Sequence, residues 1–552
     1  MLTARRVTKS YGAKLVLDGV SVAVGSRTRM GVVGPNGIGK STLLRILAGL
    51  EEPDAGTVER APTTLAVGWL PQEPEGLEGE SLQGYLARRT GVTQAEADLE
   101  QCTTRLADDS STDAVEAYTA ALERFLALGG DDLAARAASV VHDVGLPADR
   151  LHVAMSDLSG GQAAKAALAA ILLARFDVFL LDEPTNNLDF EGLARLESFL
   201  DGLPGAVIVV SHDRAFLDRS VHRILEIEEE SHRATEHAGG WSDYVAAKAL
   251  GRAQQYEAFD KYQSDKQRLA ARAREQRDWA VSGVAKAKKN PKDNDKAQRD
   301  FRINRTEKQA GKVRATEKAI ERLEVVDKPW EGWQLQMQLA PEARSGDVVA
   351  RLEGAVVRRG SFTLGPVDLE IGWQERLAIV GPNGSGKSTL LGGLLGSLPL
   401  DAGRRFLGPG VKVGIMDQSR GAFGAEGRTV LEVFLAETGF TRTDEARSLL
   451  AKFGLGADHV HRTGNRLSPG ERSRALLASL MAQGVNCLVL DEPTNHLDLA
   501  AIDELERALD GYEGTLLLVT HDRALLDAVQ VTRSIAVTAG SVAPRELLHP
   551  EG

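Results

Sequence analysis

Cysteine is scarce in this chain of 552 residues, which contains only Cys102 and Cys487. Two thiols so far apart in the sequence cannot form a zinc ribbon, an iron–sulfur cluster or a disulfide framework, so we expect a reducing compartment, the cytoplasm. Long apolar runs are also missing, because the longest, Ala166–Ala174, ends at Arg175. A membrane-spanning helix needs about 20 apolar residues. We therefore expect no transmembrane segment, and the N-terminal stretch lacks the apolar core of a secretory signal.

Positive charge is also in the minority, and it is unevenly distributed. The net charge of the chain is −12, but residues 251–325 contain 20 Lys and Arg against 12 Asp and Glu, a net of +8. A basic segment in an acidic protein indicates a polyanionic partner. Because acidic residues are interleaved with the basic ones, charge alone leaves a solvated helix as the alternative.

The sequence contains a long internal repeat. GPNGIGKST begins at residue 34 and GPNGSGKST at residue 381, which is 347 residues later. Three further pairs are each separated by 309 residues: LSGGQ and LSPGE (158 and 467), DEPTNNLD and DEPTNHLD (182 and 491), SHDRAFLD and THDRALLD (211 and 520). Periods this long indicate duplicated domains. The change of offset means that the first copy has 38 extra residues between its first two motifs.

The segments around the motifs predict an α/β fold. Apolar runs at 29–33 and 377–380 end at a glycine loop and are followed by apolar-periodic stretches at 41–50 and 388–398, which is the order strand, loop, helix. Strands alternating with helices predict a parallel sheet that is covered on both faces. Further buried strands are predicted at 177–181, 206–210, 487–490 and 515–519.

These elements divide the chain into three expected parts. The first nucleotide-binding domain would span residues 1–240, with an enlarged helical subdomain at about 85–150 that includes a helix at 113–128. The second would span 330–552. Residues 241–329 have few helix breakers before Gly283 and Asn290-Pro291, which predicts two long helices joined in a hairpin that turns near 284–295. A helix of about 40 residues would be roughly 60 Å long.

The two GxxxxGK[ST] segments carry the residue types of a phosphate cradle. Their glycines let backbone N–H groups close around phosphate oxygens, and the N-terminus of the next helix adds the positive end of its dipole. Lys40 and Lys387 are expected to reach the β- and γ-phosphates. Ser41 and Ser388 would place a hydroxyl on Mg²⁺. Two such matches, each between a predicted strand and a predicted helix, argue against chance.

Paired carboxylates follow two of the other predicted strands. Asp182 and Asp491 end apolar strands, where a carboxylate can hold Mg²⁺. Glu183 and Glu492 come next, and a carboxylate there can polarise the water that attacks the γ-phosphate.

Histidines end two more apolar runs. A lone histidine at a strand end is usually structural, but His212 and His521 each follow their Asp-Glu pair at the same spacing. This regularity favours a contact with the γ-phosphate at both positions.

Together these segments resemble the ATP-binding cassette (ABC) ATPases over nearly the whole chain, twice. In that family two cassettes pack head to tail, and the LSGGQ segment of each caps ATP held by the other. The resemblance implies ATP and Mg²⁺ as cofactors, with Gln72 and Gln418 among the Mg²⁺ ligands. One composite site would use Gly34, Asn36, Gly37, Gly39, Lys40, Ser41, Thr42, Gln72, Asp182, Glu183 and His212, closed by Ser468, Gly470 and Glu471. The other would use Gly381, Asn383, Gly384, Gly386, Lys387, Ser388, Thr389, Gln418, Asp491, Glu492 and His521, closed by Ser159, Gly160, Gly161 and Gln162.

Two positions depart from the family pattern. LSPGE has Pro469 where LSGGQ has a glycine, which removes one N–H donor, so the site closed by the second copy is expected to be slower. The adenine-stacking aromatic resembles Tyr11 in the first copy, whereas the second offers Arg359 or Phe362. Because both glutamates are present, we expect ATP hydrolysis at both sites.

The absence of a membrane segment, the DEPTN motifs and the basic hairpin between the cassettes resemble the ABC-F family. That resemblance implies a monomer that binds the 70S ribosome near the tRNA exit site, its linker reaching 23S rRNA, P-site tRNA and the peptidyl-transferase centre. The stretch KNPKDNDK is more similar to linkers of the antibiotic-resistance type than to those of the housekeeping factor. Phosphate contacts are expected from Lys286, Lys288, Lys289, Lys292, Lys296, Arg299 and Arg302, and base stacking from Trp279 and Phe301. For Trp279, packing within the hairpin stays open as the alternative.

Three alternatives stay open on these grounds: a housekeeping ABC-F translation factor, the ATPase subunit of an ABC transporter, and a DNA-repair ABC ATPase. The hypothesis of a transporter ATPase gives the basic hairpin no role. The hypothesis of a DNA-repair ATPase conflicts with the uninterrupted cassettes and with the lack of zinc-binding cysteines.

Overall fold

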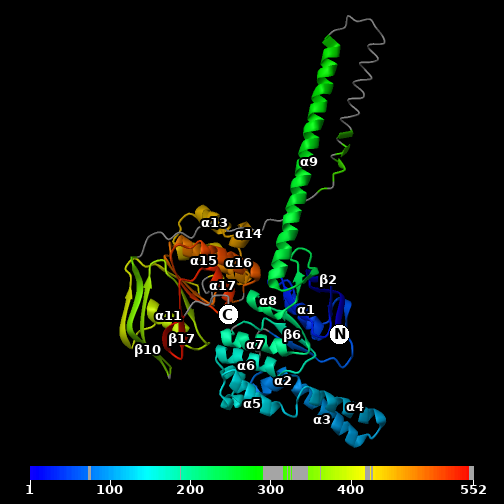
Figure 1. Ribbon diagram of the computed structural model, residues 1–552, viewed down its shortest axis with the longest axis vertical. Coiled ribbons are helices and arrows are strands. Elements are labelled where there is room, and N and C mark those ends of the chain that lie inside the picture. Colours follow the sequence, from blue (N-terminus) through cyan, green and yellow to red (C-terminus); the bar gives the residue numbers. More distant parts are fainter. Residues whose placement is uncertain are drawn as a thin grey trace. The chain divides into compact units, whose positions relative to one another are not determined.

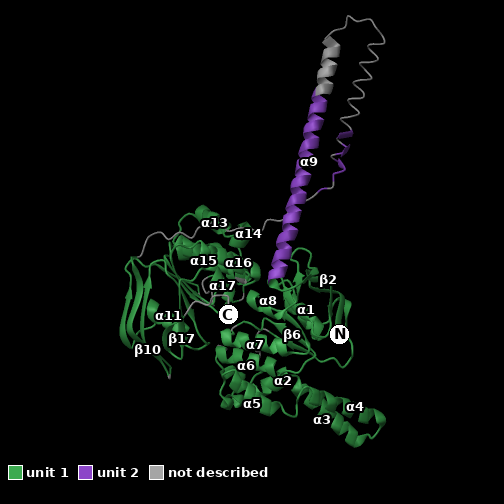
Figure 2. Ribbon diagram, viewed as in Figure 1, with its two compact units in different colours: residues 1–241, 334–552 green, residues 242–333 purple. Residues whose placement is uncertain are grey.

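The protein is described by a computed structural model whose contacts divide the chain into two compact units (Figures 1 and 2). One unit combines residues 1–241 and 334–552, and the other is residues 242–333. The structure describes residues 1–71, 76–186, 188–289, 315, 316, 318, 319, 321–323, 325, 346–360, 362–416, 423, 427–495 and 497–545, with only the backbone for 160, 279–289 and 469.

The first cassette contains two sheets. An antiparallel sheet has the order β2-β1-β4, formed by β1 (Leu2–Tyr11), β2 (Lys14–Val24) and β4 (Ala55–Arg60). The central sheet has the order β5-β6-β7-β3-β8-β9, in which all neighbours are parallel except the edge strand β9. Its strands are β5 (Val67–Leu70), β6 (Val178–Asp182), β7 (Ala206–Val210), β3 (Arg29–Val33), β8 (Arg223–Ile227) and β9 (Ala234–Ala238).

The second cassette repeats this architecture. Its antiparallel sheet has the order β11-β10-β13, formed by β10 (Val348–Arg359), β11 (Phe362–Gly372) and β13 (Ala402–Leu407). The central sheet has the order β14-β15-β16-β12-β17-β18, with β18 antiparallel at the edge. Its strands are β14 (Val413–Met416), β15 (Cys487–Asp491), β16 (Thr515–Val519), β12 (Arg376–Val380), β17 (Arg533–Thr538) and β18 (Ser541–Arg545).

The predicted α/β fold class is confirmed, and the two central sheets have the predicted parallel strands. β7 and β16 have the predicted bounds, and both are buried throughout. The antiparallel sheets and the antiparallel edge strands were not predicted. Their strands alternate between buried and exposed residues, as β2 does, and pack one face on the core of the central sheet.

Helices connect the strands in both cassettes. In the first they are α1 (Lys40–Ala48), α2 (Leu82–Arg89), α3 (Val92–Asp108), α4 (Thr112–Ala127), α5 (Leu133–Asp143), α6 (Gly160–Leu173), α7 (Phe190–Gly202) and α8 (Arg214–Ser220). In the second they are α11 (Lys387–Leu395), α12 (Val430–Thr438), α13 (Thr443–Lys452), α14 (Ala457–Val460), α15 (Pro469–Ala482), α16 (Leu499–Asp510) and α17 (Arg523–Ala528).

The helices α3 and α4 account for most of the extra length of the first cassette. They lie between α2 and α5, whereas only residues 439–442 separate α12 from α13. Ser111 begins α4 as its N-cap, because its side chain accepts a hydrogen bond from the N–H of Ala114.

The second unit contains α9 (Trp241–Lys289), a helix of 49 residues. At 1.5 Å per residue its length is about 74 Å. The helix continues through Gly283 to Lys289, inside the range 284–295 predicted for the turn, since one glycine costs a long helix only about 1 kcal/mol. Thr316, which lies beyond α9 in the sequence, contacts this helix. Its hydroxyl donates a hydrogen bond to the Gln276 side chain at 3.0 Å. The predicted turn beyond Lys289 lies outside the described residues.

No helix in the described part of the chain combines the length and the apolar character that crossing a membrane requires.

Candidate nucleotide-binding sites

The loop between β3 and α1 folds around its own lysine. Lys40 is buried, and its Nζ donates hydrogen bonds to the carbonyl oxygens of Gly34 at 2.7 Å and Pro35 at 3.1 Å. Gly34 has φ 149°, and a Cβ there would lie 2.7 Å from the carbonyl oxygen of Ile227. Only glycine therefore permits this close approach of loop and strand.

The equivalent loop of the second cassette has the same geometry. Lys387 Nζ donates to the carbonyl oxygens of Gly381 at 2.7 Å and Pro382 at 3.3 Å, and it lies 3.0 Å from His521 Nε2. Burial lowers the pKa of both Lys40 and Lys387. A buried ammonium is costly unless an anion offsets its charge, so both loops suit a bound anion.

The predicted Mg²⁺ ligands lie beside these loops. Asp182 ends β6 and Asp491 ends β15, and the Ser388 hydroxyl donates to Asp491 Oδ2 at 3.0 Å. Burial raises the pKa of Asp182, and a hydrogen bond from Ser41 opposes this rise. Hydroxyl and carboxylate oxygens are the ligands that Mg²⁺ prefers, usually with substrate phosphates and water completing the shell.

Glu183 and Glu492 are held in an unusual backbone conformation. Each has φ 50°, and each N–H donates to the end of the neighbouring strand, at Val210 O (2.9 Å) and Val519 O (2.8 Å). A positive φ is uncommon for glutamate and is stored mainly at functional sites. Burial raises the pKa of each glutamate to about 8, against the opposing charge of the lysine. Both carboxylate oxygens of Glu183 are buried.

The two histidines meet these glutamates. His212 Nε2 lies 3.0 Å from Glu183 Oε1, and His521 Nε2 lies 3.4 Å from Glu492 Oε1. Burial, followed by the charge of the nearby lysine, lowers the pKa of each histidine to about 3. Both imidazoles are therefore neutral at pH 7 and can act as hydrogen-bonding groups.

A cavity of about 440 Å³ gathers the residues of the first cassette. Tyr11 stands at its edge, 47% exposed, and its hydroxyl donates to Glu51 at 2.6 Å. The cavity is lined by Tyr11, Lys14, Val16, Asn36, Gly37, Gly39, Lys40, Ser41, Thr42, Asp182, Glu183, Asn186, Val210 and His212.

The hairpin register relates the two candidate adenine-stacking positions. Tyr11 pairs with Lys14 at the end of the β1–β2 hairpin, and Arg359 pairs with Phe362 at the end of β10–β11. Arg359 thus takes the place of Tyr11. Phe362, on the opposite strand, is packed so closely against the phosphate-binding loop that a Cβ on Gly386 would lie 2.6 Å from its ring.

Both signature segments begin a helix through a capping box. Ser159 accepts from the N–H of Gln162, whose side chain accepts from the N–H of Ser159 at 3.0 Å. Ser468 and Glu471 do the same around α15, with Glu471 also 3.2 Å from His459 Nε2.

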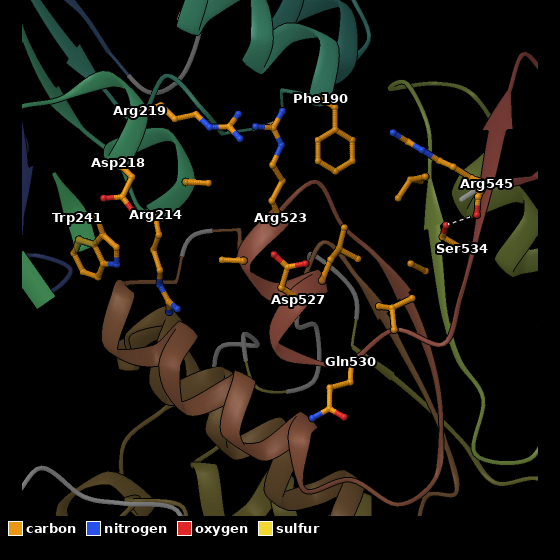
Figure 3. A pocket seen from close by; sticks show the side chains of 16 residues that line it. Phe190, Arg214, Asp218, Arg219, Trp241, Arg523, Asp527, Gln530, Ser534 and Arg545 are labelled. Carbon is orange, nitrogen blue, oxygen red and sulfur yellow. Dashed lines mark hydrogen bonds between the residues drawn. The ribbon is translucent and has the colours of Figure 1, made fainter. Parts of the chain in front are cut away.

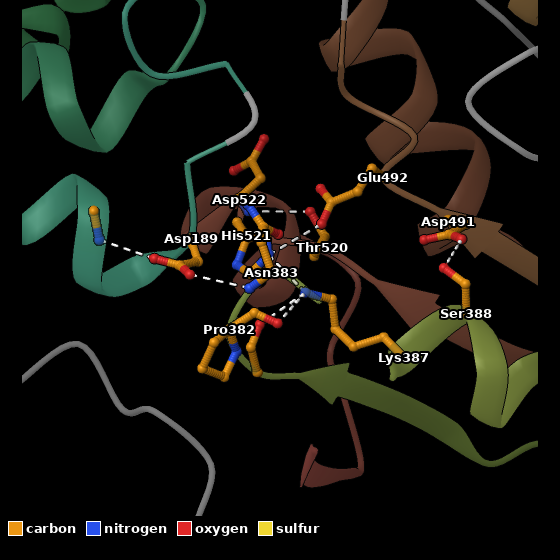
Figure 4. A network of polar contacts seen from close by, with 12 residues as sticks. Asp189, Pro382, Asn383, Lys387, Ser388, Asp491, Glu492, Thr520, His521 and Asp522 are labelled. Carbon is orange, nitrogen blue, oxygen red and sulfur yellow. Dashed lines mark hydrogen bonds and ion pairs between the residues drawn. The ribbon is translucent and has the colours of Figure 1, made fainter. Parts of the chain in front are cut away.

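The structure also joins the cassettes reciprocally. Asp189 Oδ2 accepts a hydrogen bond from the N–H of Asn383 at 3.0 Å (Figure 4). Asp498 Oδ2 accepts one from the N–H of Asn36 at 3.2 Å. The other oxygen of each aspartate caps the next helix, α7 or α16. Each aspartate therefore binds the phosphate-binding loop of the opposite cassette. Although burial opposes it, the N–H groups of Gly192 and Asn383 lower the pKa of Asp189.

The signature segments lie next to these contacts. A Cβ on Gly161 would be 3.4 Å from the Cβ of Asn383, across the cassettes. In the second cassette, a Cβ on Gly470 would be 3.1 Å from the Cβ of Ala501, on the first turn of the helix that Asp498 caps.

Sequence reasoning missed these two aspartates. A signal was present, because Asp189 and Asp498 end the DEPTNNLD and DEPTNHLD segments at the common offset of 309 residues. Of the predicted site residues, Gln72 and Gln418 lie outside the described residues, as do Lys292, Lys296, Arg299, Phe301 and Arg302. The helix α9 includes Trp279, Lys286, Lys288 and Lys289, of which only the backbone is described.

Comparison with known proteins gives a family match in both cassettes. The ABC transporter family profile matches residues 17–186 and 364–495. The tylosin resistance ATP-binding protein TlrC of Streptomyces fradiae is 37% identical, covering 95% of each chain. The energy-dependent translational throttle protein EttA of Mycobacterium tuberculosis is 32% identical, over 95% of this chain and 89% of its own. ABC transporter F family member 5 of Arabidopsis thaliana is 30% identical, over 97% and 74%.

Solved structures share the fold at lower identity. The RNase-L inhibitor structure matches with a TM-score of 0.56 at 20% identity, over 98% of this chain and 90% of that chain. A complex containing the archaeal ribosome recycling factor aABCE1 matches with a TM-score of 0.55, also at 20% identity, over 97% and 89%.

Proposed function

Because this chain is an ATP-binding ATPase of the ABC-F family, we propose that it is a cytoplasmic, monomeric ribosome-binding factor that protects translation from antibiotics. In this proposal ATP closes the two cassettes around two composite sites, and the closed form binds the 70S ribosome. This clamp-like closure is supported by two reciprocal hydrogen bonds between the cassettes. Asp189 accepts one from Asn383, and Asp498 accepts the other from Asn36.

The residues of each site have distinct proposed roles. Lys40 and Lys387 bind the terminal phosphates. This role is supported by their burial, because a buried ammonium requires a nearby anion. Glu183 and Glu492 accept a proton from the attacking water, and their raised pKa supports a base held in a dry environment. His212 and His521, neutral at pH 7, donate a hydrogen bond to the γ-phosphate.

Mg²⁺ would be held by Ser41 and Asp182 in one site and by Ser388 and Asp491 in the other. The 3.0 Å contact between Ser388 and Asp491 supports this pairing of hydroxyl and carboxylate. When bound, the ion would offset the negative charge of the phosphate oxygens.

The first test is ATP turnover by the double variant Glu183→Gln with Glu492→Gln. Hydrolysis is expected to fall at least about 100-fold, because the base is lost from both sites. ATP binding should persist, since the lysines and loops remain. If the folded double variant hydrolysed ATP at the wild-type rate, these glutamates would not be the bases.

Ribosome binding is supported by the relatives. EttA is named as a translational throttle and TlrC as a tylosin resistance protein. The linker of residues 241–329 is the part proposed to act on P-site tRNA or the peptidyl-transferase centre. Its lysines at 286, 288 and 289 suit phosphate contacts on tRNA and 23S rRNA, which need no base readout.

The second test is co-sedimentation of the double glutamine variant with 70S ribosomes in the presence of ATP. Retention with ribosomes is expected, and replacing lysines 286, 288 and 289 by alanine should reduce it, most strongly at low salt, where phosphate contacts contribute most to binding. Binding to membranes without binding to ribosomes would favour a transporter ATPase instead.

The third test addresses protection. Expression in a susceptible bacterium is expected to raise the inhibitory concentration of tylosin or of other macrolides, lincosamides or streptogramins. The double glutamine variant should not raise it. Unchanged inhibitory concentrations, together with ribosome binding, would favour the alternative of a housekeeping translation factor, to which the similarity with EttA also points.

A further inference from the structure

The two composite sites differ in one aromatic contact that crosses from the first cassette to the second. Phe190 is the first residue of α7, directly after Asp189. Its ring meets the imidazole of His521 edge-on, with centroids 5.3 Å apart and an interplanar angle of 75°. Aromatic pairs prefer this T-shaped geometry.

The ring of Phe190 is held on two sides by cations. The guanidinium of Arg523 lies 5.7 Å from the ring centroid and that of Arg545 lies 5.9 Å from it. Figure 3 shows the ring between these two arginines at the border of a cavity of about 610 Å³. Both arginines belong to the second cassette, so the ring packs between cations of the opposite cassette, at a cavity that residues of both cassettes line.

The equivalent position of the repeat has no ring. Leu499 is the first residue of α16 and follows Asp498, as Phe190 follows Asp189 at an offset of 309 residues. The histidine of the first-cassette site, His212, therefore faces a cassette whose residue at this position is aliphatic. The second-cassette site therefore has an aromatic contact on its histidine that a leucine cannot provide in the first-cassette site. The shared sequence motifs of the two sites do not show this difference.

The contact acts on a histidine whose Nε2 has two polar neighbours. His521 Nε2 lies 3.0 Å from Lys387 Nζ and 3.4 Å from Glu492 Oε1. A neutral imidazole can rotate about its side-chain bonds, and an edge contact on the ring removes part of that freedom. The ring of Phe190 can thus hold the orientation in which Nε2 points at the group bound by Lys387.

We propose that Phe190 is a positioning residue for His521, so that ATP hydrolysis in the second-cassette site depends on an aromatic side chain supplied by the first cassette. Hydrolysis in the first-cassette site has no such dependence. This inference rests on the proposed function, because it takes His521 to be the γ-phosphate contact of that site. Separation of the cassettes would withdraw the ring and slow the second-cassette site.

The test measures ATP hydrolysis in one composite site at a time. Glu183→Gln leaves only the second-cassette site competent, and Glu492→Gln leaves only the first. The pre-steady-state burst of phosphate at saturating ATP gives the hydrolysis rate constant, so slow opening of the cassettes does not limit the measurement. The ATP concentration at half-saturation is recorded in parallel.

Phe190→Leu in the Glu183→Gln background is expected to lower the burst rate constant about three- to tenfold, the range of an aromatic pair, with little change in half-saturation. In the Glu492→Gln background the same substitution should leave the rate constant unchanged. Phe190→Tyr should restore the rate in the first background, since its ring can make the same edge contact.

An equal loss in both backgrounds would overturn the proposal and indicate a general role of Phe190 in closure. No loss in either background would also overturn it. A rise in half-saturation at an unchanged rate constant would point to ATP affinity and would again overturn it. If the double glutamine variant still hydrolysed ATP, the proposed function would fail first, whatever Phe190 did.

Discussion

At the scale of single residues, the interface between the cassettes buries two like charges. Asp213 caps α8 and Asp522 caps α17, each by accepting a hydrogen bond from a backbone N–H. Burial, followed by the charge of Asp213, raises the pKa of Asp522 to about 6, and burial also raises that of Asp213. The ionised form of Asp522 is thus disfavoured in the folded chain, although its oxygen is needed as a cap.

We expect Asp522→Asn to stabilise the fold above pH 6, because an amide oxygen keeps the cap and removes the buried charge. The carboxyl pKa is about 3.9 in unfolded chains and about 6 here. The stability that this group contributes is therefore present at pH 4 and lost as the pH rises through 6. The gain for the variant is at most about 3 kcal/mol at pH 8 and small at pH 4.5.

The measurement is the melting temperature at pH 4.5 and at pH 8. An increase of about 2–6 °C is expected at pH 8, and at most about a third of it at pH 4.5. Replacing the exposed Asp108 by asparagine serves as the control, and it should shift neither value. A destabilised Asp522→Asn variant at both pH values would mean that its charge is compensated in the folded chain.

At the scale of elements, the start of α15 explains how proline enters a signature segment. Pro469 occupies the first turn of the helix, where the N–H groups have no partner within the helix in any case. Proline therefore costs the helix nothing, while it removes one of the donors that the segment could offer to an anion. In α6 the equivalent position is Gly160, which keeps its N–H.

Exchanging these two residues should redistribute activity between the sites. Pro469→Gly in the Glu492→Gln background is expected to raise the burst rate of the first-cassette site about three- to tenfold, by restoring a donor to the charge that develops there. Gly160→Pro in the Glu183→Gln background should lower that of the second-cassette site. A lower rate for Pro469→Gly would show that rigidity of the turn matters more than the missing donor.

Elements were predictable where one local pattern decides them. The glycine loops, the buried strands such as β7, and the helices after Lys40 and Lys387 follow from apolar runs and glycine spacing alone. The antiparallel sheets could not be predicted in this way. The strands β1 and β4 pair although more than 40 residues separate them, and no sequence pattern links the two strands. The long helix α9 was predictable, because this part of the sequence has few helix breakers.

At the scale of the whole chain, what could not be predicted is the set of contacts that join the repeats. Asn383 and Asp189 are separated by 194 residues, and no local spacing connects them. The same holds for the ion pairs between the cassettes. Arg214 contacts Glu506, and its repeat equivalent Arg523 contacts Glu197. Repetition at an offset of 309 marks such residues as equivalent, but it does not say that they meet crosswise.

These ion pairs are unequal, which leads to a prediction about closure. Arg214 lies 2.6 Å from Asp503 and donates to both oxygens of Glu506, at 2.9 and 3.1 Å. Arg523 reaches Glu197 only at 3.7 Å. Bidentate, shielded pairs are the strong ones, and truncating one partner leaves the other charges unpaired.

Arg214→Ala is therefore expected to raise the ATP concentration at half-saturation about five- to tenfold, because ATP must then close a weaker interface. Arg523→Ala should raise it less than about threefold. The control is the exposed Arg442→Ala, whose partners Asp444 and Glu445 belong to the same cassette. Equal effects of Arg214→Ala and Arg523→Ala would mean that the two crossings contribute alike to closure. A normal half-saturation for Arg214→Ala would mean that closure depends on the aspartate contacts to the phosphate-binding loops rather than on these charges.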